Sequence, residues 1–155
     1  MIDLNGNVQR SITVRAEQQR AFDAFTREMT AWWPPAHHIG SAPIAEIVVE
    51  PYVGGRWFTK HEDGTETSTG VVAEWDPPRR FVVTWQISAQ WQYDEALRTE
   101  VQVDFVAEAP DITRVDLAHV GFDGYGTDAD TMRETFDGPG AWIATLEAYA
   151  GHAGG

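Results

Sequence analysis

Apolar residues recur at every second position over most of the chain from residue 44 to residue 121. In one stretch Val101, Val103 and Phe105 alternate with Glu100 and other polar residues. Such alternation is typical of antiparallel strands that have one buried and one solvated face. Together with an isolated early strand, the pattern predicts a sheet of six or seven strands, at residues 8–14, 45–50, 56–61, 67–75, 81–88, 98–107 and 113–121.

Helical spacing replaces this alternation between the first two predicted strands. Phe22, Phe25 and Met29 fall on one stripe of residues 17–29, which therefore predicts a short amphipathic helix. Paired prolines from Pro34 onward cannot continue a helix and end this segment.

A second helical stretch, residues 141–150, closes the chain with Trp142, Leu146 and Tyr149 at helical spacing. It is the longest element available to cover the apolar face of the sheet. The expected fold is therefore α+β: a curved antiparallel sheet wrapped on a long C-terminal helix, with short helices after the first strand. We expect one domain over residues 1–155 with its core at 8–150, and a pocket where the curved sheet stands away from the helix.

Composition narrows the classes of partner. The formal net charge is −13, with 24 acidic and 11 basic residues, and such a field repels phosphate groups. Nucleic acid and anionic membranes are therefore not expected as partners. The absence of cysteine excludes disulfides and thiolate chemistry. No apolar run is long enough to span a membrane and the first residues do not resemble a secretory leader, so a cytoplasmic location is expected.

The seven tryptophans are unusual for a domain of this size and suggest a lined cavity as well as a core. Strand parity places Trp85 with Phe81, and Trp75 with Val71 and Ala73, on the face toward the helix. The alternative is that these aromatic side chains only fill the core. The candidate ligand-binding residues, with Trp57 assigned the inward position of its strand, are Trp32, Trp33, Trp57, Trp75, Phe81, Trp85, His119, Trp142 and Leu146.

Polar candidates for catalysis are few. His119 shares the inward face of its strand with apolar residues, where it could orient a ligand or exchange a proton, although such histidines are more often satisfied core residues. His37 and His38 are adjacent and lack the spacing of a zinc pair. The sequence therefore predicts no catalytic set, no metal site and no cofactor.

Several motifs occur in an order that resembles the SRPBCC superfamily (START and Bet v 1-like proteins). Within it they are most similar to the branch related to the C-terminal domain of the activator of the 90-kDa heat-shock chaperone's ATPase. The resemblance implies a helix-grip fold with a ligand cavity and no particular reaction. The motifs that carry it are Glu50-Pro51-Tyr52-Val53-Gly54-Gly55-Arg56, Gly70-Val71-Val72-Ala73-Glu74-Trp75-Asp76-Pro77-Pro78, Trp32-Trp33-Pro34 and Val83-Thr84-Trp85.

Three functional hypotheses remain at this stage. The first is binding of a small hydrophobic molecule, of lipid, polyketide or aromatic type, in the cavity between the sheet and the C-terminal helix. The second is an enzyme of the cyclase, dehydratase or hydrolase type that uses the same pocket. The third is a chaperone-associated or other protein-binding module, and a homodimer is possible in each case.

Overall fold

The computed structural model describes residues 2–154, which form a seven-stranded antiparallel sheet of order β1-β7-β6-β5-β4-β3-β2. The first and last strands pair, and β2 forms the opposite edge. The α+β architecture predicted from the alternation is confirmed. The strands are β1 Val8–Val14, β2 Ile44–Val49, β3 Arg56–His61, β4 Glu66–Asp76, β5 Arg80–Trp85, β6 Thr99–Ala109 and β7 Ile112–Val120.

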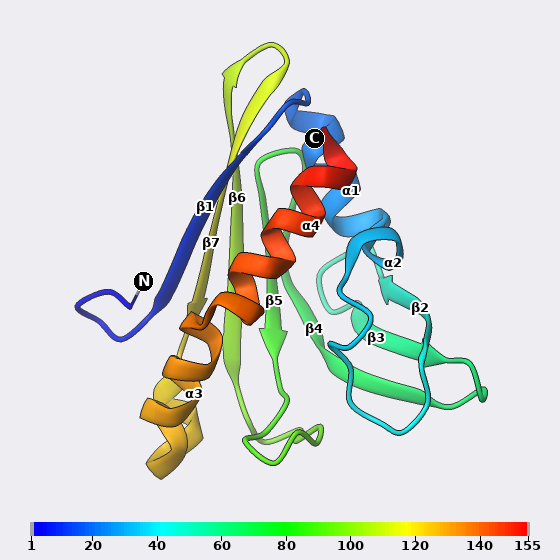
Figure 1. Ribbon diagram of the computed structural model, residues 1–155, viewed down its shortest axis with the longest axis vertical. Helices are drawn as coiled ribbons and strands as arrows, with labels where there is room; N and C mark the ends of the chain where they lie inside the picture. The colour runs from blue at the N-terminus through cyan, green and yellow to red at the C-terminus, as the bar shows by residue number, and fades with distance from the viewer. Residues whose placement is uncertain (1, 155) are drawn as a thin grey trace.

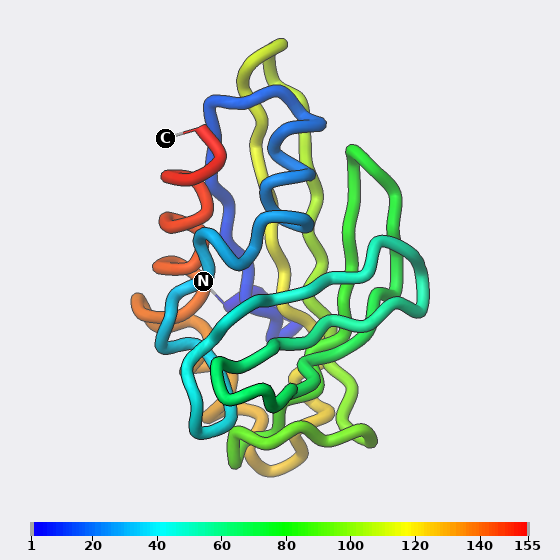
Figure 2. Tube along the Cα trace, turned by 90° about the vertical axis from the view of Figure 1, so that its right-hand side faces the viewer, coloured from blue at the N-terminus to red at the C-terminus, as the bar shows by residue number. Residues whose placement is uncertain are grey.

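The helices lie on the concave side of the sheet, with the C-terminal helix running along it (Figures 1 and 2). This helix begins with a π-helical turn in which Ala141 leaves helical geometry (φ −97°, ψ −120°), so regular helix starts only at Ala144. The helical segments are α1 Gln18–Arg27, α2 Met29–Trp32, the 3₁₀ segment Phe122–Asp128, α3 Ala129–Asp137, the π turn Pro139–Ile143 and α4 Ala144–Ala153.

Two β-bulges curve the sheet at β4. The register with β3 shifts between Trp57 and Phe58, which leaves Thr69 as an extra residue on β4. The register with β5 shifts between Val72 and Glu74, which leaves Ala73 extra. Bulges bend a strand and increase its twist. Beyond these two bulges, β2 and β3 run across the direction of the other strands (Figure 2).

One prediction from strand parity is wrong because of the second bulge. Trp75 was expected to share its face with Val71 and Ala73. Instead Val72, which is 1% exposed, faces the core together with Trp75, because the extra Ala73 shifts the alternation by one residue. Trp75 still packs inward, with its ring 5.2 Å from that of Phe22.

Gly70 lies between the two bulges where β4 approaches β5 closely. A Cβ atom at this position would lie 1.9 Å from the Thr84 carbonyl oxygen, so no larger residue fits without moving the backbone. The Thr84 hydroxyl also accepts the Val71 amide at 2.8 Å, in place of a regular ladder bond. The glycine therefore permits the curvature that the bulges create.

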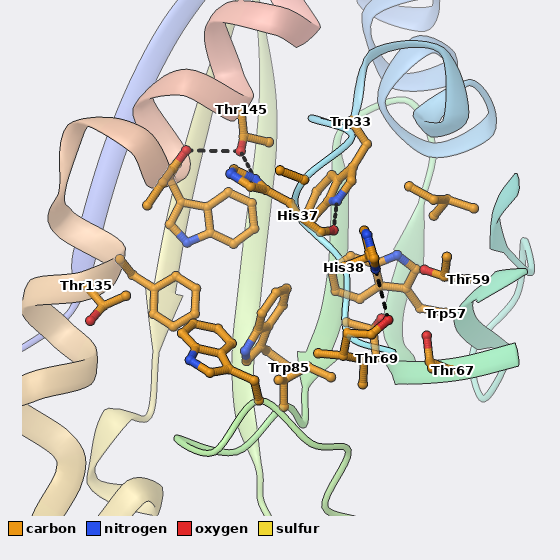
Figure 3. Close-up of a pocket in the computed structure, with 18 of the residues that line it drawn as sticks. Trp33, His37, His38, Trp57, Thr59, Thr67, Thr69, Trp85, Thr135 and Thr145 are labelled. Carbon is orange, nitrogen blue, oxygen red and sulfur yellow. Dashed lines mark hydrogen bonds between the residues drawn. The ribbon is translucent and has the colours of Figure 1, made fainter. Parts of the chain in front are cut away.

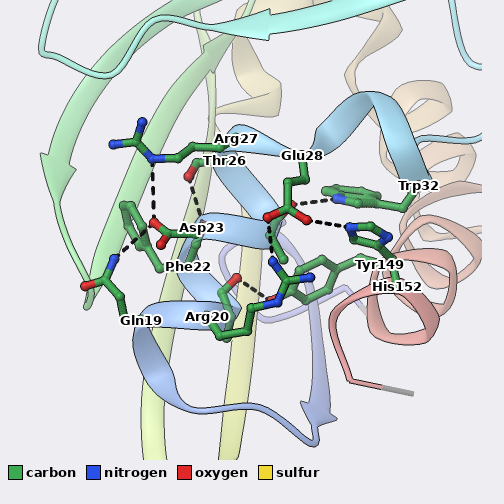
Figure 4. Close-up of polar contacts among 12 residues, drawn as sticks. Gln19, Arg20, Phe22, Asp23, Thr26, Arg27, Glu28, Trp32, Tyr149 and His152 are labelled. Carbon is green, nitrogen blue, oxygen red and sulfur yellow. Dashed lines mark hydrogen bonds and ion pairs between the residues drawn. The ribbon is translucent and has the colours of Figure 1, made fainter.

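A buried hydrogen bond between Tyr149 and Ala21 anchors α4 to α1 among aromatic side chains of the core (Figure 4). The Tyr149 hydroxyl donates to the Ala21 carbonyl at 2.7 Å, and its ring lies 5.0 Å from that of Phe25. At the surface, Glu28 accepts from Arg20 at 2.5 Å and contacts His152 at 2.7 Å. The surface pairs are partly exposed and contribute little, so the buried bond is the stronger link.

Replacing Tyr149 with Phe should lower the free energy of unfolding by about 1–2 kcal/mol, because the buried hydrogen bond between the Tyr149 hydroxyl and the Ala21 carbonyl is lost. Urea denaturation measures this change. Tyr52→Phe is the matched control, since Tyr52 is 54% exposed and should shift stability by less than about 0.5 kcal/mol. Equal midpoints for the two variants would contradict the proposed anchor.

Candidate functional site

A cavity of about 460 Å³ opens between the β2–β5 end of the sheet and the start of the C-terminal helix (Figure 3). The loop after α2, α3 and the loop after β5 complete its walls. Its lining residues are Trp33, Ala36, His37, His38, Ile39, Ile47, Trp57, Thr59, Thr67, Thr69, Trp85, Ile87, Trp91, Thr135, Phe136, Gly140, Ala141, Trp142 and Thr145.

Four tryptophans form a closed ring of edge-to-face contacts in the wall of this cavity. The ring centroids of Trp33 and Trp57 lie 6.0 Å apart, and those of Trp57 and Trp85 lie 5.6 Å apart. Trp142 closes the ring at 6.0 Å from both Trp85 and Trp33. Phe136 packs 5.4 Å from Trp85 and extends the aromatic surface. Interlocked rings of this kind form a stiff apolar wall.

A chain of buried hydrogen bonds on the side away from the cavity holds Trp142 and the backbone of Trp85 in place. The Trp142 indole N–H donates to His119 Nδ1 at 3.2 Å, so Nδ1 is unprotonated. His119 Nε2 therefore carries the proton and donates to the Thr99 hydroxyl at 2.9 Å, which in turn donates to the Trp85 carbonyl at 2.8 Å. His119 is fully buried and does not line the cavity.

Trp33 is fixed by the short loop that follows it. Its indole N–H donates to the His37 carbonyl at 2.7 Å, and the His37 amide donates to the Pro34 carbonyl at 2.9 Å. The two prolines that end the helix thus also turn the chain so that His37 faces the cavity. Its ring contacts Trp33 edge-on, at 6.3 Å between centroids.

His37 and His38 are the titratable side chains of the cavity wall. Burial lowers the pKa of His37, and a hydrogen bond to the backbone of Gly140 offsets this only in part, so the ring is neutral at neutral pH. Its Nδ1 lies 3.5 Å from the Thr145 hydroxyl. His38 Nδ1 lies 3.1 Å from the Ile39 carbonyl, and its ring packs 5.6 Å from that of His61. The neutral imidazole of His37 can accept a proton from a ligand.

The structure brings together four of the nine residues selected from the sequence: Trp33, Trp57, Trp85 and Trp142 line the cavity. The other five lie elsewhere in the core. The Trp32 indole donates to the Ala24 carbonyl, Trp75 and Phe81 pack against phenylalanines of α1, and Leu146 is buried on α4. His119 lies behind the tryptophan ring.

Sequence reasoning missed most of the polar lining. Thr59 follows Trp57 by two residues on β3 and therefore faces the same way. Strand parity alone was enough to identify Thr59 as a candidate lining residue. Thr69 faces the cavity because of a bulge, and Trp91 because its loop folds back, with Trp91 at φ 61°. His37 and His38 were considered only as metal ligands, whereas the structure places them in the wall of the cavity.

Within residues 2–154, no group of three or more His, Cys, Asp or Glu side chains is arranged to hold a metal ion. Of the helices in the same range, none has the length and apolar character needed to cross a membrane.

A family model described as activator of Hsp90 ATPase homolog 1-like protein matches residues 15–151. No curated protein gives a significant match. Among solved structures, the chain is similar to an anthrahydroquino-γ-pyrone synthase, Txn09, with 38% identity over 94% of this chain and 95% of that one and a TM-score of 0.66.

Two further structures are similar over nearly the whole chain. CalC, a self-sacrificing resistance protein from Micromonospora echinospora, has 28% identity, covers 97% of this chain and 96% of its own, and has a TM-score of 0.73. The Aha1 dimer from Colwellia psychrerythraea has 14% identity, 95% coverage of both chains and a TM-score of 0.61, a level of likeness that shows the fold alone.

The buried state of His119 predicts how stability depends on pH. Burial lowers the pKa of His119 to about 3, whereas an imidazole in an unfolded chain titrates near about 6.5. Between these values only the unfolded chain binds the proton, so the free energy of unfolding should fall by roughly 1 kcal/mol for each pH unit below about 6.5. In His119→Gln this contribution is missing, so the stability gap between parent and variant should narrow as the pH falls.

Urea denaturation of both proteins at several pH values measures that gap. NMR of the ring nitrogens in the parent protein provides a second measurement that needs no variant, and should show a neutral ring protonated at Nε2 well below about pH 6. A gap that is constant with pH, or a ring that titrates near its ordinary value, would contradict the assignment.

Proposed function

The chain belongs to the family of activator of Hsp90 ATPase homolog 1-like proteins, within the SRPBCC superfamily, and from that premise we propose that its cavity binds a flat, polycyclic aromatic molecule of polyketide type. The observation that carries the proposal is the closed ring of four tryptophans in the wall of the cavity. A rigid wall of aromatic faces and edges complements a planar ring system better than a flexible chain.

The size and polarity of the cavity support this ligand class. A volume of about 460 Å³ lies within the range of about 300–1,000 Å³ that small-molecule sites occupy. Most lining side chains are apolar, with a few hydroxyl and imidazole groups to orient a ligand. The net charge of −13 disfavours anionic ligands such as fatty acids, which supports an aromatic rather than a lipid ligand.

The comparisons support the polyketide-type ligand independently of the cavity. The γ-pyrone synthase shares 38% of its residues with this chain over almost the full length of both, and its name describes a fused aromatic product. The resistance protein CalC, at 28% identity, shows that similar chains also serve roles that are not biosynthetic. Binding of a planar aromatic compound is the function that the cavity and the comparisons support together.

Filling the cavity should block binding without unfolding the protein. Thr59→Phe adds a ring from β3 into the space, which should weaken binding of the flat tricycle 1,8-dihydroxyanthraquinone by about tenfold or more, because overfilling costs about 1–3 kcal/mol. Quenching of tryptophan fluorescence measures the affinity. Lys60→Phe, on the outer face of the same strand, is the matched control and should bind like the parent.

The outcome also distinguishes a cavity from a filled core. In a filled core Thr59→Phe would be strongly destabilising, whereas in an empty cavity the melting temperature should change little. Parent protein that binds dodecanol but not the anthraquinone would instead identify a carrier of chain-like lipids, and the proposal would be wrong.

A second candidate function is closure of an oxygen ring on such a ligand, favoured by the similarity to the γ-pyrone synthase. In this reaction a phenol oxygen adds to a carbonyl carbon of a neighbouring 1,3-diketone, and the phenol proton passes to a base. The resulting hemiketal loses water to give the γ-pyrone, so no oxidant is needed. His37, neutral and in the cavity wall, is the base that this candidate function requires.

If the protein turns over, His37→Gln should lower kcat by about 100-fold or more, while the affinity for 1,8-dihydroxyanthraquinone changes by less than about threefold. The substrate for the assay is 1-(1-hydroxynaphthalen-2-yl)butane-1,3-dione, whose cyclisation changes its ultraviolet absorbance. His38→Gln is the matched control and should retain most of the rate. Parent protein that does not exceed the spontaneous rate would eliminate turnover of this diketone and leave the binding function in place.

A further inference from the structure

The direction of one hydrogen bond at the sheet side of the cavity follows from its partners. His61 is 3% exposed, and its Nδ1 lies 2.8 Å from the Ala42 carbonyl oxygen. A carbonyl oxygen only accepts, so Nδ1 carries a proton, and in the neutral form of the ring it is the only ring proton. Nε2 is then an acceptor, and the Thr67 hydroxyl at 2.8 Å must donate to it. Thr67 therefore offers the cavity lone pairs but no proton.

Two threonines on the helical side of the cavity are limited in the same way. The Thr135 hydroxyl donates to the Thr131 carbonyl at 2.9 Å, and the Thr145 hydroxyl donates to the Ala141 carbonyl at 3.0 Å. Each bond returns one turn along its own helix. Because a hydroxyl has one proton and two lone pairs, both oxygens are left as acceptors. Thr145 is 1% exposed whereas Thr135 is exposed, so Thr145 supplies the buried acceptor on this side. Figure 3 shows Thr145 on the opposite side of the cavity from Thr67.

We propose that the cavity selects ligands that carry hydroxyl donors at their edges, namely polyphenols and hydroquinones, over the corresponding quinones and ethers. Thr67, oriented by His61, is the specificity-determining residue. This inference rests on the proposed function, since it specifies the polar edge of the same aromatic ligand. A quinone offers acceptors only, so it would leave acceptors unpaired on both sides of the cavity, whereas a phenol O–H pairs with them.

The physical basis of this selection is the cost of burying an unpaired polar group. Sites built to bond a ligand hydroxyl discriminate strongly against an analogue that lacks it. The hydroxyls of Thr59 and Thr69 have no hydrogen-bond partner within residues 2–154 and can rotate to suit either kind of ligand. Selectivity therefore depends on the hydroxyls that already donate their proton within the protein. Among these, Thr67 is the one whose partner is a buried side chain, His61.

The test is a series of naphthalenes that bind to the parent protein at about pH 8, where an ordinary imidazole is neutral. Tryptophan fluorescence and calorimetry give the affinities of 1,5-dihydroxynaphthalene, 1,5-dimethoxynaphthalene and 1,5-dichloronaphthalene. The dichloro compound is close to the diol in size but has no donor. We expect the diol to bind about tenfold more tightly than either analogue, from one or two net hydrogen bonds.

Variants at Thr67 locate the effect. Thr67→Val should reduce the preference for the diol over the dichloro compound about fivefold, because the acceptor is lost and the side-chain shape is kept. Thr67→Ser is the matched control and should keep the preference, since it retains the hydroxyl that His61 orients. The melting temperature of each variant shows whether it is folded, and the ligand series on the parent does not depend on either variant.

The outcomes separate this inference from the function on which it rests. If all three naphthalenes bind equally well, the inference is wrong and the aromatic-binding function stands. If the dimethoxy compound binds more tightly than the diol, the cavity prefers acceptors and the assigned proton positions are wrong. If none binds, the proposed function fails and the inference fails with it. A preference that Thr67→Val does not reduce would overturn the role of Thr67.

Discussion

The curvature of β4 determines where the other parts of the molecule lie. Its two extra residues, Thr69 and Ala73, bend the strand, and Gly70 between them allows β4 to approach the Thr84 carbonyl. A flat sheet would press against the C-terminal helix along its whole length. Because β4 bends, Trp75 packs against α1 at one end, and Trp57 on β3 turns toward Trp33 at the other. The cavity is the space that this bend leaves.

The core and the cavity depend on each other through buried polar groups. His119 is surrounded by aromatic rings, yet it bonds with Trp142 and Thr99, and it holds part of the cavity wall in place. A well-satisfied buried network specifies one arrangement of its members, because each alternative leaves a polar group unpaired. The same reasoning applies at the cavity surface, where His61 fixes the direction of the Thr67 hydroxyl. Buried histidines thus determine both the shape of the cavity and the polarity of its edge.

This arrangement suits a family in which one fold serves several roles. The fold provides a sheet, a covering helix and a space between them, while particular side chains decide what the space accepts. Here the wall is a ring of tryptophans, and the titratable groups that face the cavity are His37 and His38, in a loop. Because the Trp33 indole bonds with the His37 backbone carbonyl, replacing the His37 side chain changes the chemistry of the cavity and leaves that bond to the ring in place. Binding and turnover are therefore closely related possibilities for chains of this type.

The sequence alone was sufficient to predict an antiparallel sheet of six or seven strands and a short helix after the first strand, because alternation and helical spacing are local signals. Parity also showed that Trp57 and Phe58 face opposite ways, but only the structure shows that Trp57 is the one that lines the cavity. The sequence could not divide the aromatic residues between core and cavity. Trp32 and Trp33 are adjacent, yet one bonds with Ala24 in the core and the other lines the cavity. Only the tertiary structure assigns these residues to the core or to the cavity, because a bulge changes which face of the sheet a residue occupies. Likewise, no local pattern in the sequence predicts that the Thr67 hydroxyl bonds with His61.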